Sequence, residues 1–211
     1  MLIERLAGDR SKKSMLVASF DDGSSISVTP EQAADFALHS GKELSEDDYK
    51  RLKSALELRN SKAKAARMLG ARDLSSREVE KRLAAGGATP EAAREAARWL
   101  EDIGAIDDAR YASAIVAHYT KKGYGPARAK SELYRRGIPR ELWDDALRSA
   151  EESPPGSAGA FLEKKLRGST DKDDLRRASD ALRARGFSYD AARAEIREYI
   201  ENLDRPDEEE N

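Results

Sequence analysis

The sequence lacks the residues on which many catalytic and metal sites depend. None of its 211 residues is cysteine, which excludes disulfides, thiol catalysis and thiolate metal ligands. The only histidines, His39 and His118, are about eighty positions apart, so a zinc site or a Ser-His-Asp triad has little to draw on. We therefore expect a protein that is not an enzyme and that carries no cofactor and no metal.

Long apolar segments are also missing. No run approaches the roughly 20 apolar residues of a membrane span. The chain becomes charged at Glu4 and Arg5, before the apolar region of a signal peptide can form. We expect a cytoplasmic monomer without membrane association.

Charge is abundant in the sequence. Asp, Glu, Lys and Arg make up 37% of the residues and hydrophobic residues 39%. This is enough apolar surface for folding but too much charge for one thick core. A thin helical array fits the balance, because each repeated unit buries only a narrow stripe. We predict a mainly α fold, a tandem array of three-helix units with a small N-terminal β-hairpin and helical extension.

The N-terminal extension has local signals of its own. Residues 15–20 and 25–28 alternate or cluster in the manner of strands around a turn at Gly23, which predicts a β-hairpin packed on a neighbouring helix. The Thr-Pro-x-Gln pattern at residues 29–32 predicts a capped helix start. We expect this helix to run to about Ser40 and to stop at Gly41.

A second helix start follows at Ser45. Its hydroxyl is placed as an N-cap, and Leu44 and Tyr49 have the spacing of a hydrophobic staple. From Tyr49 to about Leu74 the apolar residues keep a helical rhythm. One long helix or two abutting helices would both fit.

A repeat begins after this segment. Three times a leucine precedes a glycine by four positions: Leu83 and Gly87, Leu133 and Gly137, Leu182 and Gly186. Each pair is followed by residues that start helices. Glycine readily adopts the left-handed conformation that ends a helix, and the leucine one turn earlier packs beneath it. The glycines are therefore predicted to be helix stops that set the pitch of three repeats.

The repeat predicts domain boundaries. The extension covers residues 1–58, the first three-helix unit 59–106 and the second 107–152. Residues 153–203 hold a Pro- and Gly-rich linker and the third unit, which we expect to shift relative to the second. Residues 204–211 form an acidic tail that we expect to be disordered.

Charge alternates along the units, although the net charge is only −2. The balances are +5 for residues 59–87, −4 for 88–109, +6 for 110–137, −3 for 138–157 and +3 for 158–187. The first two helices of each unit are thus basic and the third is acidic. Either like helices line up and form charged strips, or neighbouring helices form ion pairs and cancel the field.

The segment 75–147 carries a set of spaced motifs. They are Ser75-Ser76-x-Glu78-Val79-x-x-x-Leu83, Trp99-Leu100-x-x-x-Gly104-x-Ile106-Asp107-Asp108-x-x-Tyr111-Ala112 and Gly123-x-Gly125-x-x-Arg128-x-x-x-Glu132-Leu133-x-x-x-Gly137-Ile138. With these residues the chain resembles the RecX family, bacterial regulators of the RecA recombinase. The match covers about a third of the chain strongly and is looser in the third unit.

The resemblance implies an elongated, curved, modular helical protein that binds in the groove of the RecA–DNA filament. It implies restraint of the recombinase, ATPase and co-protease activities of RecA, and hence a role in recombination, DNA repair and the SOS response. The alternative is a helix-turn-helix-like protein that binds DNA without RecA, since a basic second helix suits the major groove. The near-neutral net charge argues against tight autonomous DNA binding, and leaves weak phosphate contacts.

Two residue sets follow from these patterns. The candidates for contact with a partner are basic residues of the first two units: Arg77, Lys81, Arg82, Lys121, Lys122, Arg128, Lys130, Arg135 and Arg136. The motif residues that we interpret as structural are Asp107, Asp108, Tyr111, Gly125, Leu133 and Gly137. Either Asp107 or Asp108 is expected to cap the following helix. The turn around Gly123 and Gly125 is favoured over a phosphate-binding loop, because a lone Gly-x-Gly is weak evidence for one.

Overall fold

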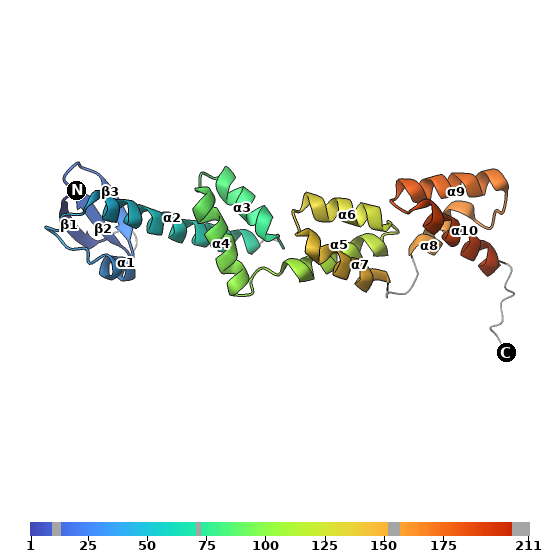
Figure 1. Cartoon of the computed structure of the whole chain (residues 1–211), viewed down its shortest axis with the longest axis horizontal. Helices are drawn as coiled ribbons and strands as arrows, with labels where there is room; N and C mark the ends of the chain where they lie inside the picture. The colour runs from blue at the N-terminus through green and yellow to red at the C-terminus, as the bar shows by residue number, and fades with distance from the viewer. Residues whose placement is uncertain (10–13, 71–72, 152–156, 204–211) are drawn as a thin grey trace. The chain divides into compact units, whose positions relative to one another are not determined.

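The structure, a computed structural model, describes residues 1–9, 14–70, 73–151 and 157–203 and is mainly helical (Figure 1). The chain divides into two compact bodies. One consists of residues 1–70 and 80–100, and the other of residues 71–79 and 101–211. The acidic tail and most of the predicted linker, residues 153–156, lie outside the described residues. The remaining linker residues, from Ser157 on, already belong to a helix.

An antiparallel sheet begins the first body, in the order β1-β2-β3. The predicted hairpin is confirmed as β2 (Leu16–Phe20) and β3 (Ser25–Val28). The prediction omitted β1 (Ile3–Gly8), which pairs with β2. Its sequence alternates poorly, and the register shifts between Ile3 and Arg5, so the strand gives no clear signal of period two.

Helix α1 (Pro30–Asp35) begins as predicted. The Thr29 hydroxyl accepts the N–H of Gln32, and the Gln32 side chain accepts the N–H of Thr29, which is a complete capping box. The predicted end near Ser40 is wrong, because the helix stops at Asp35. Ala37 has a φ of 46°, which takes the backbone out of the helical region directly after the last turn.

Helix α2 (Glu46–Leu69) is one continuous helix, which decides between the two alternatives for this segment. The Ser45 hydroxyl accepts the N–H of Asp48, as an N-cap does. Leu52 is fully buried, and Tyr49 lies edge-on to Phe20 with ring centroids 5.5 Å apart. The sheet, α1 and the first turns of α2 thus share one hydrophobic core.

Three successive three-helix units make up the chain from α2 onward. The first unit continues from α2 into α3 (Ser76–Ala85) and α4 (Pro90–Asp102). The second consists of α5 (Asp108–Lys121), α6 (Pro126–Arg135), a 3-10 turn η1 (Arg140–Leu142) and α7 (Trp143–Glu151). The third consists of α8 (Ser157–Leu166), α9 (Lys172–Ala184) and α10 (Tyr189–Leu203).

The middle helix of every unit ends in the same way. Gly87, Gly137 and Gly186 have φ of 89°, 69° and 95°. The leucine four residues earlier is fully buried each time. Its carbonyl accepts the N–H of the residue after the glycine, at 3.1, 3.0 and 3.2 Å. This is the Schellman arrangement, and it confirms the tandem three-helix fold.

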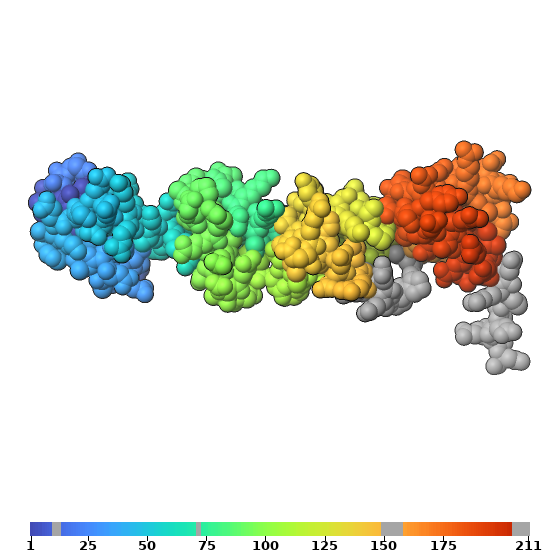
Figure 2. Space-filling view, viewed as in Figure 1, coloured from blue at the N-terminus to red at the C-terminus, as the bar shows by residue number. Residues whose placement is uncertain are grey.

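The second and third units have separate hydrophobic cores. Figure 2 shows the outer surface of the second unit in yellow and of the third in orange to red. Val116 and Leu133 are central to the core of the second unit. Leu162 and Leu182 hold the same place in the third. Neither cluster includes a buried residue of the other, so each unit buries its own narrow stripe.

Candidate interaction surface

The basic residues of α3 differ in exposure. Arg77 and Lys81 are exposed, whereas Arg82 is half-buried. Arg77 and Lys81 are four residues apart, so they share one face of the helix.

A larger group of cations surrounds the turn between α5 and α6. Lys121 and Lys122 are exposed at the C-terminal end of α5, and Arg128 and Lys130 are exposed on α6. Among the described residues, none of these four forms an ion pair. Tyr134 lies on the same helix one turn after Lys130 and is 71% exposed. The exposed face of α6 is therefore cationic with one aromatic ring.

Arg135 is exposed but is held by a carboxylate. Its Nε and Nη2 donate to the Glu132 oxygens at 2.9 and 2.5 Å, and Glu132 itself is buried. Hydrogen bonds from Arg135, and then from Arg136, lower the pKa of the Glu132 carboxyl to about 2, against the opposing effect of burial. The charge of Arg135 is thus largely balanced within the helix.

Arg136 points into the protein, where its side chain is 23% exposed. Nε donates to Glu132 at 2.8 Å, and Nη1 donates to the Tyr111 hydroxyl at 2.8 Å. Nη1 also lies 3.5 Å from a carboxylate oxygen of Glu78, in the first turns of α3. The sequence pattern placed Arg136 among the surface cations. The structure places it in a network that joins α6, α5 and the start of α3.

The start of α3 is fastened to the second unit by further hydrogen bonds. Ser75 and Glu78 form a capping box, and the Ser75 hydroxyl donates to the carbonyl of Arg136. The N–H of Ser76 donates to the Asp108 carboxylate at 3.1 Å. Gly137 lies against Arg77, where an added Cβ would meet the Arg77 Cβ at 2.9 Å. Together these contacts dock the end of α6 on the beginning of α3.

Asp107 and Asp108 accept hydrogen bonds from different helices. Asp107 is the N-cap of α5, accepting the N–H of Arg110 at 2.9 Å. Asp108 instead accepts from α3. Burial raises the pKa of the Asp108 carboxyl, neighbouring carboxylates add to the rise, and the N–H of Ser76 opposes it.

The turn at Gly123 and Gly125 has its backbone donors occupied. The N–H of Gly125 donates to the carbonyl of Arg185 at 3.0 Å, and the N–H of Ala127 to the carbonyl of Gly186 at 3.1 Å. In a phosphate-binding loop, N–H groups at the start of a helix such as α6 would instead donate hydrogen bonds to the bound phosphate. The observed bonds favour the turn over the phosphate-binding alternative.

The ion pairs bear on whether the basic helices keep their charge. Most pairs in the described part of the chain join residues three or four apart on one helix, and Arg136 with Glu78 joins two helices. Such exposed pairs stabilise a helix only slightly. Because few of these pairs join different helices, their pattern favours basic faces that remain open to solvent over neutralisation of one helix's charge by its neighbour.

Three residues that join units escaped the sequence patterns. Ser75 and Glu78 were recognised only as motif residues, and Arg185 was not singled out at all. The available signal was the Arg-Gly pair at the end of both later middle helices, Arg136-Gly137 and Arg185-Gly186. That pair repeats because both arginines occupy the same C-cap position.

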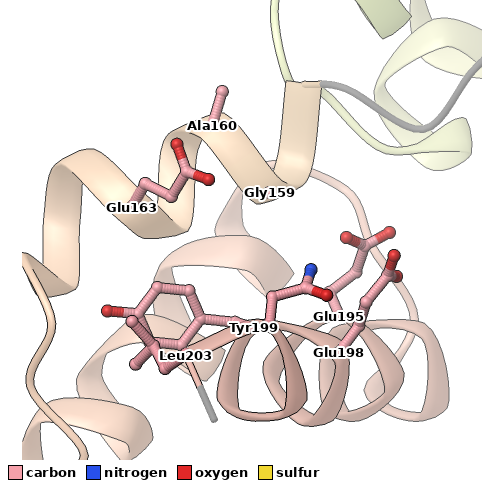
Figure 3. A pocket seen from close by; sticks show the side chains of 8 residues that line it. Gly159, Ala160, Glu163, Glu195, Glu198, Tyr199 and Leu203 are labelled. Atoms are coloured by element: carbon pink, nitrogen blue, oxygen red, sulfur yellow. The ribbon is translucent and has the colours of Figure 1, made fainter. Parts of the chain in front are cut away.

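A cavity of about 390 Å³ lies in the third unit, away from these basic residues in the sequence. Glu195 and Glu198 of α10 and Glu163 of α8 line it, together with Tyr199 (Figure 3). Burial raises the pKa of the Glu195 carboxyl, with a contribution from Glu198. Within the described residues, no group of three or more acidic or histidine side chains is arranged to hold a metal ion. Nor does any described helix have the length and apolarity needed to cross a bilayer.

Comparison with known proteins gives consistent matches. Residues 107–147 match the family model described as RecX, second three-helix domain. The protein named Regulatory protein RecX of Xanthomonas axonopodis pv. citri (strain 306) is 33% identical over 141 residues, which are 66% of this chain and 87% of that protein. The protein of the same name from Escherichia coli O7:K1 (strain IAI39 / ExPEC) is 36% identical over 98 residues, 42% of this chain and 59% of that protein.

Solved structures agree in fold. A crystal structure of a regulatory protein RecX has a TM-score of 0.71 at 20% identity and covers 95% of this chain and 98% of its own. The crystal structure of RecX from Lactobacillus salivarius has a TM-score of 0.61 at 22% identity, covering 69% of this chain and 98% of its own. At these identities the likeness concerns the architecture.

Proposed function

The chain belongs to the RecX family, and we propose that it is a regulatory protein that binds the RecA filament on DNA and inhibits it. In this role it restrains the recombinase, ATPase and co-protease activities of RecA in the cytoplasm, and so tunes recombination, DNA repair and the SOS response. It performs no catalysis of its own and uses no cofactor.

One observation supports the binding surface most strongly. Lys121, Lys122, Arg128 and Lys130 are exposed around one turn and form no ion pair with another described residue. Cations in this state attract an acidic protein surface or DNA phosphates without first breaking a bond within the chain. Arg77 and Lys81 extend the proposal to α3. Arg136 and, in part, Arg135 serve the fold instead, because their guanidinium groups are engaged by Glu132.

The test is charge reversal at one lysine pair with a matched pair as control. Lys121 and Lys122 follow each other at the end of α5, and Lys164 and Lys165 follow each other near the end of α8, all four exposed. We expect Lys121→Glu with Lys122→Glu to weaken suppression of DNA-dependent ATP hydrolysis by RecA about tenfold. Lys164→Glu with Lys165→Glu should suppress it as the unsubstituted protein does. Equal suppression by both folded variants removes the α5 end from the interface.

A second function, direct binding of single-stranded DNA, is favoured by Tyr134. An exposed ring beside Lys130 can stack on a base while the cations contact phosphates. Tyr189, which is 60% exposed on α10, provides the control. Tyr134→Ala should weaken DNA binding about tenfold in the absence of RecA, since one stacked base contributes about 1–3 kcal/mol, and Tyr189→Ala should not. No loss with Tyr134→Ala would leave RecA as the principal partner.

A further inference from the structure

The second and third units meet through the ends of their middle helices. Two carbonyls directly after the end of α9 accept hydrogen bonds from N–H groups at the start of α6. The carbonyl of Arg185 accepts from the N–H of Gly125, and the carbonyl of Gly186 accepts from the N–H of Ala127. Figure 1 shows α6 and α9 end to end in the second body. The negative end of one helix dipole therefore meets the positive end of the other.

The contact requires glycine on both sides. A Cβ at Gly186 would lie 2.6 Å from the backbone nitrogen of Arg128. A Cβ at Gly125 would collide with the carbonyl of Gly186. Such a close backbone approach has no room for a side chain, so these glycines serve contact between units as well as turn geometry.

Arg185 connects this contact to the end of α5. Its Nη1 donates to the carbonyls of Lys122 and Gly123 at 3.2 and 3.3 Å. A guanidinium at the C-terminal end of a helix also complements the negative end of the dipole. The same side chain lies 4.0 Å from the ring centroid of Phe161 and 5.1 Å from that of Tyr124. Its backbone thus caps α6 while its side chain caps α5.

The cores of the two units do not take part in this contact. Leu133 belongs to one cluster and Leu182 to the other, and their buried members are distinct. What joins the units here is a set of hydrogen bonds and a cation beside aromatic rings. Such a contact can open while both cores stay packed.

From these contacts we infer that Arg185 is a positioning residue. It clamps the third unit onto the turn between α5 and α6, and thereby fixes the backbone from which Lys121, Lys122 and Arg128 project. Opening of the clamp frees the third unit and loosens that turn. The effect on partner binding rests on the proposed function, whereas the clamp itself does not.

The first experiment measures the clamp alone. Since the sequence has no cysteine, spin labels can be placed at Ala117→Cys on α5 and Ala194→Cys on α10, both exposed. Pulsed dipolar spectroscopy should give one narrow distance, which Arg185→Ala broadens. Arg176→Ala, an exposed arginine of the same helix, should leave it narrow. A narrow distance in Arg185→Ala overturns the clamp. If that variant loses helical content, Arg185→Gln replaces it under the same criterion.

The second experiment measures the consequence for binding. With RecA filaments on single-stranded DNA, Arg185→Ala should bind about tenfold more weakly than Arg176→Ala, as expected for loss of hydrogen bonds to a charged group. Equal binding overturns the link between the clamp and the partner surface. Absence of binding by the unsubstituted protein instead refutes the proposed function, and the distance measurement still decides the clamp.

Discussion

Arg136 and Arg185 occupy the same place in successive units, yet their contacts with the preceding unit differ in chemistry. We call the contact of the α6 end with the start of α3 the first joint, and the contact of the α9 end with the start of α6 the second joint. Each arginine is the C-cap of a middle helix, directly before a glycine with positive φ. Arg136 contacts Glu132, Glu78 and the Tyr111 hydroxyl. Arg185 contacts backbone carbonyls and aromatic rings. One repeat position thus holds an ion-paired joint in one unit and a backbone joint in the next.

The two joints share their backbone geometry. In both joints the end of a middle helix docks on the start of the preceding one. The Ser75 hydroxyl donates a hydrogen bond to the carbonyl of Arg136, and the Gly125 N–H donates one to the carbonyl of Arg185. The geometry is common to both joints, whereas the side chains that secure it vary. The first joint, which contains carboxylates, should therefore respond to pH, whereas the second should respond little to pH and most strongly to loss of space.

The largest effect is expected from an added methyl group in the joints. Gly186→Ala combines an unfavourable φ with collision against the backbone of Arg128, which should cost about 4 kcal/mol. Gly87 has the same φ sign but no atom within 4 Å of an added Cβ, so Gly87→Ala should cost only about 1 kcal/mol. Urea unfolding measures both. Equal costs would show that the glycines serve turn geometry alone.

The next effect is removal of each arginine. Arg136→Met leaves Glu78 without this cation and Glu132 with Arg135 only, which should cost about 3 kcal/mol. Arg185→Met removes hydrogen bonds to two backbone carbonyls but leaves no buried charge without its partner, and should cost about 1 kcal/mol. Urea unfolding at pH 7 provides the measurement. If Arg185→Met costs as much as Arg136→Met, the distinction between the joints is wrong.

The pH dependence of the first joint should follow Glu132. Its pKa lies at about 2 in the folded protein against 4.5 for the unperturbed group. A depressed folded pKa adds stability above the unfolded value, and this stability is lost as the pH falls toward 2. Between pH 6 and pH 3 the loss should be about 2 kcal/mol. Glu132→Gln should have a lower free energy of unfolding at pH 6, and that free energy should change less between pH 6 and pH 3. An unchanged pH dependence in Glu132→Gln would contradict the attribution to Glu132.

The smallest effect is expected at Asp108, where the sign is opposite. Its pKa is raised by burial, so this group favours the folded state more as the pH falls through its folded pKa. Asp108→Asn keeps an oxygen for the N–H of Ser76 and removes the buried charge. The free energy of unfolding at pH 7 should change by less than about 1 kcal/mol. A loss of several kcal/mol would mean that the carboxylate charge itself holds α3.

The sequence was sufficient for the repeat because helix stops are local. Gly137 and Leu133 reveal their relation within one turn, and the Thr29 capping box within four residues. Strand β1 escaped because its sequence alternates poorly and its register with β2 shifts between Ile3 and Arg5, and the early end of α1 depends on the backbone at Ala37. The joints escaped for the same reason. Arg136 and Ser75 are 61 residues apart, and no local pattern distinguishes an arginine that caps another helix from one that faces solvent.

Amide hydrogen exchange can show whether successive middle helices are joined end to end, as the bonds from Gly125 and Ala127 indicate. The first N–H groups of a helix normally lack a partner and exchange quickly. We predict slowed exchange at the amides of Gly125 and Ala127, which Arg185→Ala abolishes while the amide of Leu133 stays protected. Fast exchange at Gly125 and Ala127 in the unsubstituted protein would contradict the claim.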